Sequence, residues 1–130
     1  MESKKQLSKG RLWVPYILQG IIVLMFLMGA VMNILGTEQA VDGAVAMGYP
    51  ESSVRYMGLV LLLGTLLYAY PKTSGLGAVL LTGWLGGAVA THTINGDPLF
   101  NTVFPIIFGI VLWLALWLRQ EKVQSLFSFK

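Results

Sequence analysis

Seven polar residues of this 130-residue chain stand inside or beside long apolar stretches, where their side chains could do chemistry: Asn33, Glu38, Arg55, Thr91, His92, Asp97 and Asn101. Ionisable groups are costly inside hydrocarbon, so those found there are candidates for function. An arginine would bind an anionic or carbonyl group, and a histidine would donate or relay a proton near neutral pH. Antiparallel threading of the apolar stretches would bring these residues to one end of a bundle. We therefore predict a polar, ligand-binding pocket at that end.

The same residues also have a purely structural interpretation. Arg55 would extend to lipid headgroups or pair with an acid, and His92 would cap the last carbonyls of a helix. An isolated buried charge is heavily penalised. We therefore predict that Arg55 forms an ion pair with Asp97 or Glu38. His92 or Asn33 would belong to the same network.

Sequence patterns typical of catalysis, metal binding and nucleic-acid binding do not occur. One histidine beside Asp97 provides too few ligands for a metal site, and the chain contains no cysteine for thiolate chemistry. The basic residues flank apolar segments and do not form a stripe with interleaved aromatics, which excludes a nucleic-acid partner. We predict no catalytic and no metal-ligating residues.

Four apolar stretches must position the polar residues, and each approaches bilayer length: 13–36, 54–70, 75–93 and 99–118. A spanning helix needs about 20 mostly apolar residues. The chain is 55% hydrophobic and 12% charged, whereas soluble domains are about 25% charged. The pattern predicts an all-α fold, a transmembrane four-helix bundle over residues 13–118. Residues 1–12 and 119–130 would be tails.

The segment between the first and second spans is too short and too polar to cross a bilayer. Over residues 37–48 its apolar residues recur at helical spacing, while its acidic residues face elsewhere. This predicts a short amphipathic surface helix between these spans, with Thr37 as its N-cap and Gly48 as its C-cap.

The third apolar stretch is rich in small residues, among them Gly83, Gly86 and Gly87. In lipid, helices associate by close backbone approach, so small residues mark a contact face. We therefore predict that this helix is the most buried of the four, and that leucine at Gly86 or Gly87 would disrupt folding. The alternative is a groove left open for a flat or chain-like ligand.

Basic residues precede the first span, lie in the second loop and follow the fourth span, whereas the first and third loops hold most of the acidic residues. By the positive-inside rule, both termini and the second loop are cytoplasmic. The predicted polar pocket then opens outward.

The segment GAVLLTGWLGGAVATH, from Gly77 to His92, resembles the DoxX-like family of small four-helix membrane proteins. Shorter matches are MGYP before the second span, YPKT after it and NGDP after the third. The resemblance implies a multi-pass protein of the bacterial inner (plasma) membrane. Because the family is named for a subunit associated with thiosulfate:quinone oxidoreductase, the resemblance also implies quinone-linked or lipid-related roles. Many relatives carry an acidic residue near position 61, where this chain has Leu61.

These observations favour an accessory subunit that binds a quinone or lipid and is not an enzyme on its own. Its partners would be membrane lipids, a membrane redox enzyme and further copies of itself. Two alternatives stay open. One is a small oligomeric transporter or ion-coupled permease, and the other is a membrane enzyme that uses His92 as acid or base.

Overall fold

The computed structural model of the chain describes residues 9–126, and over this range it is all-helical. Its elements are α1 (Lys9–Leu35), α2 (Glu38–Ala46), the single-turn helix η2 (Glu51–Ser53), α3 (Val54–Ala69), α4 (Ser74–Ile94), α5 (Leu99–Trp117) and α6 (Glu121–Leu126). Four helical segments are long and apolar enough to cross a membrane: α1, η2 with α3, α4 and α5. The prediction of an all-α fold with four spanning helices is confirmed.

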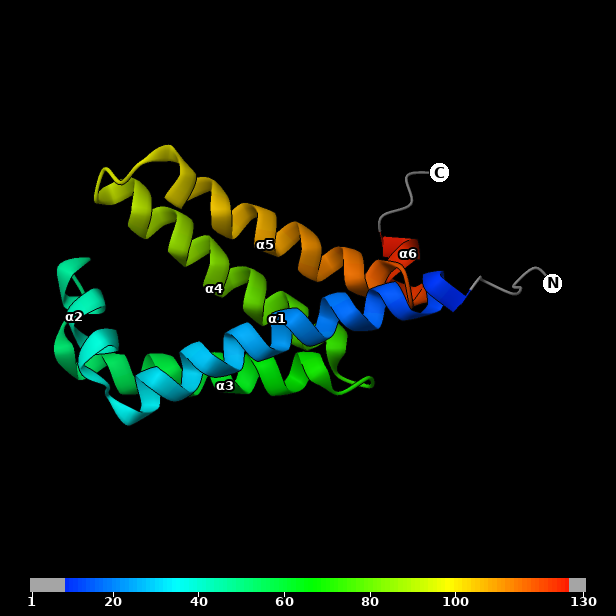
Figure 1. Ribbon diagram of the computed structural model, residues 1–130, viewed down its shortest axis with the longest axis horizontal. Helices are drawn as coiled ribbons and strands as arrows, with labels where there is room; N and C mark the ends of the chain where they lie inside the picture. The colour runs from blue at the N-terminus through cyan, green and yellow to red at the C-terminus, as the bar shows by residue number, and fades with distance from the viewer. Residues whose placement is uncertain (1–8, 127–130) are drawn as a thin grey trace.

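The four spans run antiparallel in sequence order and form a bundle (Figure 1). α1 packs on α3, α3 on α4 and α4 on α5, while α5 also contacts α1. α1 begins and α5 ends at one end, which we call the basal end; the α3–α4 turn also lies there. α2 and the α4–α5 turn lie at the opposite end, which we call the α2 end. The α1–α3 pair and the α4–α5 pair diverge toward the α2 end (Figure 1).

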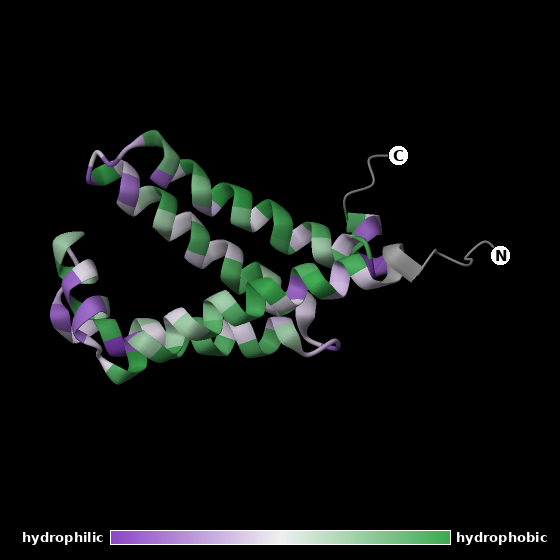
Figure 2. Ribbon diagram, viewed as in Figure 1, coloured by the Kyte–Doolittle hydropathy of each residue, from purple (hydrophilic) through white to green (hydrophobic). Residues whose placement is uncertain are grey.

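Hydrophobic residues run along all four long helices, and hydrophilic residues gather at α2 and at the turns (Figure 2). Many large apolar side chains face outward, such as Leu24, Leu63 and Ile110, which are 67%, 56% and 62% exposed. An apolar surface of this extent is far larger than a water-soluble monomer carries and suits a surrounding bilayer.

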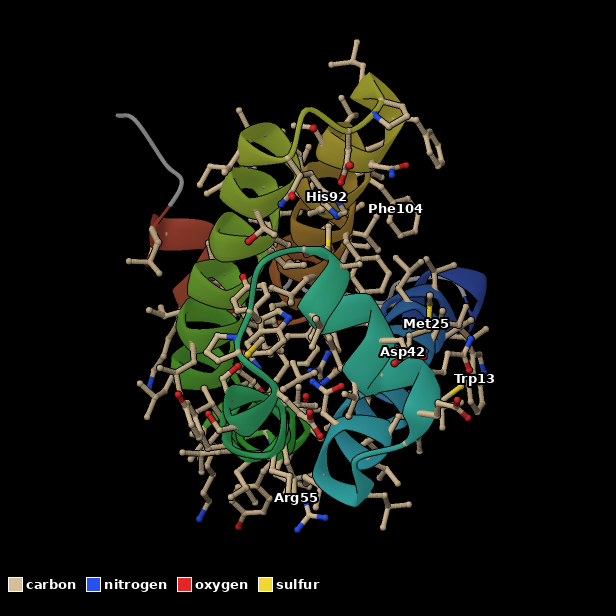
Figure 3. All side chains as sticks on the ribbon, turned by 90° about the vertical axis from the view of Figure 1, so that its left-hand side faces the viewer. Trp13, Met25, Asp42, Arg55, His92 and Phe104 are labelled. Carbon is tan, nitrogen blue, oxygen red and sulfur yellow. The ribbon has the colours of Figure 1, made fainter. Side chains whose placement is uncertain are left out.

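The helix between the first and second spans forms with the predicted N-cap, but its C-cap is Met47 and not Gly48. Thr37 is the N-cap of α2, and its hydroxyl oxygen accepts a hydrogen bond from the Ala40 N–H at 3.2 Å. Gly48 follows the C-cap residue Met47 and has a φ of +100°, a conformation that favours glycine. No residue of α2 is buried. α2 crosses in front of the bundle when the molecule is viewed from the α2 end (Figure 3).

The buried core joins all four spans through residues such as Ile22, Leu61, Leu81 and Leu112. Val123 of α6 is 3% exposed and belongs to the same cluster. Part of the segment expected to be a tail therefore folds back as a helix against the basal end.

The prediction that the third span is the most buried is wrong. In the most apolar 18 residues of each span, 28% are buried in α4, whereas 39% are buried in the α3 span. A Cβ atom added at Gly83, Gly86 or Gly87 would meet nothing within 4 Å. The physical reason is that these glycines thin α4 where its neighbours diverge, so they leave open space instead of a contact.

The close helix contacts lie at other glycines. A Cβ atom at Gly58 of α3 would lie 2.9 Å from the backbone oxygen of Ala30 and 2.7 Å from the Asn33 Cβ on α1. A Cβ atom at Gly77 of α4 would collide with the backbone of Tyr68. Gly58 and Gly77 therefore allow α3 to approach α1 and α4 closely.

Candidate functional site

His92 and Asp97 form the clearest polar pair at the α2 end. His92 lies in the last turn of α4, and its Nδ1 lies 2.6 Å from Oδ2 of Asp97 in the α4–α5 turn. The Asp97 N–H also donates to the His92 carbonyl at 3.0 Å, which fixes the turn. The two side chains are 23% and 26% exposed. A carboxylate held on one ring nitrogen orients the imidazole and determines which nitrogen carries the hydrogen.

Thr91 and Asn95 attach α4 to the segment that follows α2. The Thr91 hydroxyl lies 2.6 Å from the hydroxyl of Tyr49. The Asn95 amide donates to the carbonyl of Met47 at 3.1 Å and to that of Thr91 at 2.9 Å. The contacts to Tyr49 and Met47 bridge residues more than 40 positions apart in the chain, so they hold the α2 segment against the end of α4.

A cavity of about 430 Å³ lies between α2, α3 and α4 at this end. Eleven residues line it: Gly43, Ala44, Met47, Tyr49, Met57, Gly83, Trp84, Gly87, Ala88, Thr91 and His92. Its wall is apolar from Gly83 to Ala88, and its polar side chains come from the neighbourhood of Thr91. Since a helix rises about 1.5 Å per residue, the α4 wall from Gly83 to His92 is about 13 Å long.

Arg55 and Glu38 do not join this site, which corrects the predicted ion pair. Asp97 pairs with His92 instead, and within residues 9–126 Arg55 makes no ion pair. Arg55 is exposed, and its guanidinium lies beside the turn at Gly36, 3.5 Å from where a Cβ would be. In Figure 3 Arg55 lies at the lower edge of the bundle, far from His92 in the upper half. The reason is the divergence of the helix pairs, which carries Arg55 away with α1 and α3.

The other predicted residues divide between the two sides. Asn33 lies at the close crossing of α1 and α3, where its Cβ faces Gly58. Asn101 lies in the first turn of α5, and its N–H donates to the Pro98 carbonyl at 2.9 Å. Of the seven predicted residues, the structure brings together Thr91, His92 and Asp97. Tyr49 is an addition to the site that was not among the predicted residues, and its hydroxyl contacts Thr91 across 42 positions of the chain.

A second polar cluster, also missed by the sequence analysis, lies at the basal end. Gln19 of α1 is 7% exposed; its amide donates to the Tyr68 carbonyl at 2.9 Å and its oxygen accepts from Arg119. The Tyr68 hydroxyl donates to the Leu112 carbonyl at 2.7 Å. The guanidinium of Arg119 lies over the Tyr16 ring, 4.7 Å from its centroid. This cluster ties α1, α3 and α5 together, and Gln19 within an apolar span was its available signal.

An apolar groove of about 780 Å³ lies on the opposite face of α4, between α4 and α5. Gly86 and Gly109 are part of its floor, and the Trp113 N–H at its edge donates to the Thr82 hydroxyl at 2.7 Å. α4 thus has open space on two faces, which explains why its glycines contact so little.

A family model described as the DoxX-like family matches residues 17–115, from α1 through α5. The match includes the α2 segment, the α4–α5 turn and every residue that lines the α2-end cavity. No curated protein and no solved structure matches the chain. Because the matched range covers most of the sequence, the chain belongs to the DoxX-like family of membrane proteins.

Proposed function

We propose that this chain is an accessory membrane subunit that binds a quinone or a lipid in the α2-end cavity. The observation that carries the proposal is the distribution of polarity in that cavity, which has an apolar wall and three polar side chains: Tyr49, Thr91 and His92. Its volume of about 430 Å³ lies within the range of about 300–1,000 Å³ typical of ligand sites. A molecule with a polar head and an apolar tail matches both parts.

The cavity wall also suits a flat head group. Gly83 and Gly87 present bare backbone, and a Cβ at either position would have open space in front of it. Trp84, between them in sequence, adds an aromatic ring to the same wall. A planar ring can lie against such a surface and stack on the indole, since offset stacking of aromatic rings is favourable.

Orientation in the membrane is part of the proposal. The basic residues at both ends of the chain support a cytoplasmic basal end, which would place the cavity in the outer half of a bacterial inner membrane. Reporter fusions at Lys130 and at Gly96 should then give opposite compartments. Equal compartments at both positions would contradict the four spans, and an external Lys130 with a cytoplasmic Gly96 would contradict the orientation.

Ligand retention by purified protein tests the central claim. We expect native mass spectrometry of the protein in lipid nanodiscs to show a retained quinone or a defined lipid. Gly87→Leu should abolish retention, because Gly87 lines the cavity and a Cβ there has open space in front of it, so the leucine side chain would occupy the ligand's volume. Gly86→Leu is the matched control, since it faces the groove on the other side of α4. Equal retention by the parent and both variants would remove the cavity from the proposal, and no retention by the parent would defeat it.

We also propose that a membrane redox enzyme is the partner of this chain. His92 with Asp97 supplies one group able to accept or donate a proton, but a catalyst normally needs a second group in a complementary role. Co-purification from native membranes should recover the partner with the parent chain. Catalytic turnover by the isolated chain, lost in His92→Ala, would instead favour an enzyme, and solute flux in proteoliposomes would favour a transporter.

A further inference from the structure

The hydrogen atoms at the polar end of the cavity can be assigned from the contacts there. The Thr91 hydroxyl lies 2.8 Å from the Gly87 carbonyl and 2.6 Å from the Tyr49 hydroxyl. A carbonyl oxygen only accepts, so the single hydrogen of Thr91 must go to Gly87. Tyr49 must then donate its own hydrogen to Thr91. The Tyr49 oxygen is left with acceptor capacity alone.

A neutral His92 also presents an acceptor to the cavity, for a different reason. The Asp97 carboxylate is an acceptor, so the hydrogen in the 2.6 Å contact belongs to Nδ1 of His92. In the neutral imidazole, Nε2 then carries a lone pair. Nε2 makes no hydrogen bond within residues 9–126, and His92 lines the cavity. With a neutral His92, two acceptors therefore stand at one end of an apolar cavity: the Tyr49 oxygen and the His92 Nε2.

We infer that this cavity selects ligands whose polar head donates hydrogen bonds, and that Tyr49 is the residue that determines the selection. The inference rests on the proposed function and adds the chemical class of the ligand. At Tyr49 and a neutral His92, a head that only accepts would face two acceptors and lose its hydrogen bonds to water there without replacement. A hydroxyl or ammonium head would satisfy both groups.

Among quinone-type ligands, the inference selects the reduced form. A hydroquinone presents two hydroxyl donors, whereas the corresponding quinone presents two carbonyl acceptors on a ring of nearly the same shape. Membrane lipids offer the same contrast. The ammonium of phosphatidylethanolamine donates hydrogen bonds, and the trimethylated head of phosphatidylcholine has no N–H to donate. Each pair differs in donors while keeping its overall shape or charge.

The test compares the two redox forms of one short-chain quinone. Binding would be measured without oxygen, to the full chain in phosphatidylcholine nanodiscs. We expect the hydroquinone to bind at least about tenfold more tightly than the quinone, since an unpaired buried polar group carries a penalty of that order. Equal affinities, or a preference for the quinone, would overturn the inference and leave the proposed function standing.

Two variants separate selection from structural support. In Thr91→Val, the Tyr49 hydroxyl loses its acceptor and can donate its hydrogen to the ligand. The quinone affinity should therefore rise, and the ratio of hydroquinone affinity to quinone affinity should fall toward one. In Tyr49→Phe the acceptor is gone, so the preference should fall through weaker hydroquinone binding. Thr93→Val is the matched control, because Thr93 makes the same type of bond, to the Val89 carbonyl at 2.8 Å, and lies outside the cavity. If Tyr49 only supported the α2 segment, both affinities would fall together.

The lipid arm decides the case in which neither quinone form binds. The proposed quinone function would then fail, and the nanodiscs would be made from equal parts of the two lipids. Enrichment of phosphatidylethanolamine on the parent chain, lost in Tyr49→Phe and kept in Thr93→Val, would support donor selection with a lipid as ligand. No enrichment would overturn the inference.

Discussion

At the basal end the polar side chains bond from one helix to another, whereas at the α2 end they bond within one turn or to the α2 segment. Gln19 joins α1 to α3 and to Arg119, and Tyr68 joins α3 to α5. His92 bonds to Asp97 only five residues away, and Thr91 bonds to Gly87 and Tyr49. The spans converge where the bonds cross between helices and diverge where they do not (Figure 1).

The difference shows how one bundle can combine stability with a binding site. Polar groups at membrane depth need partners, because hydrocarbon offers none. When the partners are on other helices, as with Gln19, the polar groups hold the helices together. When the partners are local, as with His92, they require no neighbouring helix, and space for a ligand stays open.

The largest effect should come from one substitution made at both ends of α4. Gly77→Leu at the basal end should prevent stable folding, because its Cβ would collide with the Tyr68 backbone. Overpacking typically costs about 1–3 kcal/mol, and more where backbones touch. Gly87→Leu at the α2 end should fold like the parent or better, since glycine is about 1 kcal/mol less favourable than alanine in a helix. The yield and the thermal unfolding of both variants in detergent measure these effects. Similar losses of yield and stability in the two variants would contradict the contrast between the two ends.

A second effect should come from breaking the basal cluster at Gln19. Gln19→Leu leaves the Arg119 guanidinium and the Tyr68 carbonyl without their partner, which should cost about 1–3 kcal/mol. Gln39→Leu, on the exposed face of α2, is the control and should change stability little. The double variant Gln19→Leu, Arg119→Leu should lose less stability than the two single variants lose in sum, because it leaves no charged group without its partner. Additive losses in chemical unfolding would mean that the two side chains do not depend on each other.

The sequence was sufficient to predict the elements of this fold. Apolar runs near bilayer length predicted all four spans, and Thr37 predicted the start of α2. Each of these features depends on neighbours within one helix turn or on local solvent preference. The spacing of glycines did not predict which ones touch, since a small residue marks either a close contact or an open wall. Gly77 and Gly87 differ only in what lies opposite, and this depends on how the helix pairs diverge.

The candidate site was predictable only in part, for a related reason. His92 and Asp97 lie five residues apart across one turn, and both were among the predicted site residues. The prediction placed His92 or Asn33 in one network with Arg55 and its acid, Asp97 or Glu38; the structure keeps His92 with Asp97 and leaves Arg55 out. Similar depth in the membrane does not bring residues together when they lie on different sides of the bundle. The bond between Gln19 and Arg119 joins residues 100 positions apart, so no local pattern could predict it.

A smaller effect should follow from loosening the α2 segment. Asn95→Ala removes the hydrogen bonds to the Met47 and Thr91 carbonyls, and because Asn95 is exposed the loss should be about 0.5–1 kcal/mol. Amide hydrogen exchange should accelerate in residues 38–49 and stay unchanged in α1. Asn101→Ala is the matched control, since within residues 9–126 the Asn101 side chain makes no hydrogen bond. Protection of α2 equal to that of the parent would show that other contacts hold it.

The smallest effect should come from Arg55, which distinguishes the two sides of the α2 end. Its guanidinium is exposed beside Gly36, and exposed substitutions usually change stability by less than about 0.5 kcal/mol. Arg55→Met should therefore leave the melting temperature and the retained ligand unchanged. Asp97→Asn should weaken ligand retention, because it removes the carboxylate that orients His92. In a double-mutant cycle the effects of the two changes on the free energy of unfolding should add within about 0.5 kcal/mol, as expected for residues without shared partners. A coupling well above that value would mean that Arg55 reaches the cavity when the protein is in a membrane, and the polar end of the site would then include a cation beside its two acceptors.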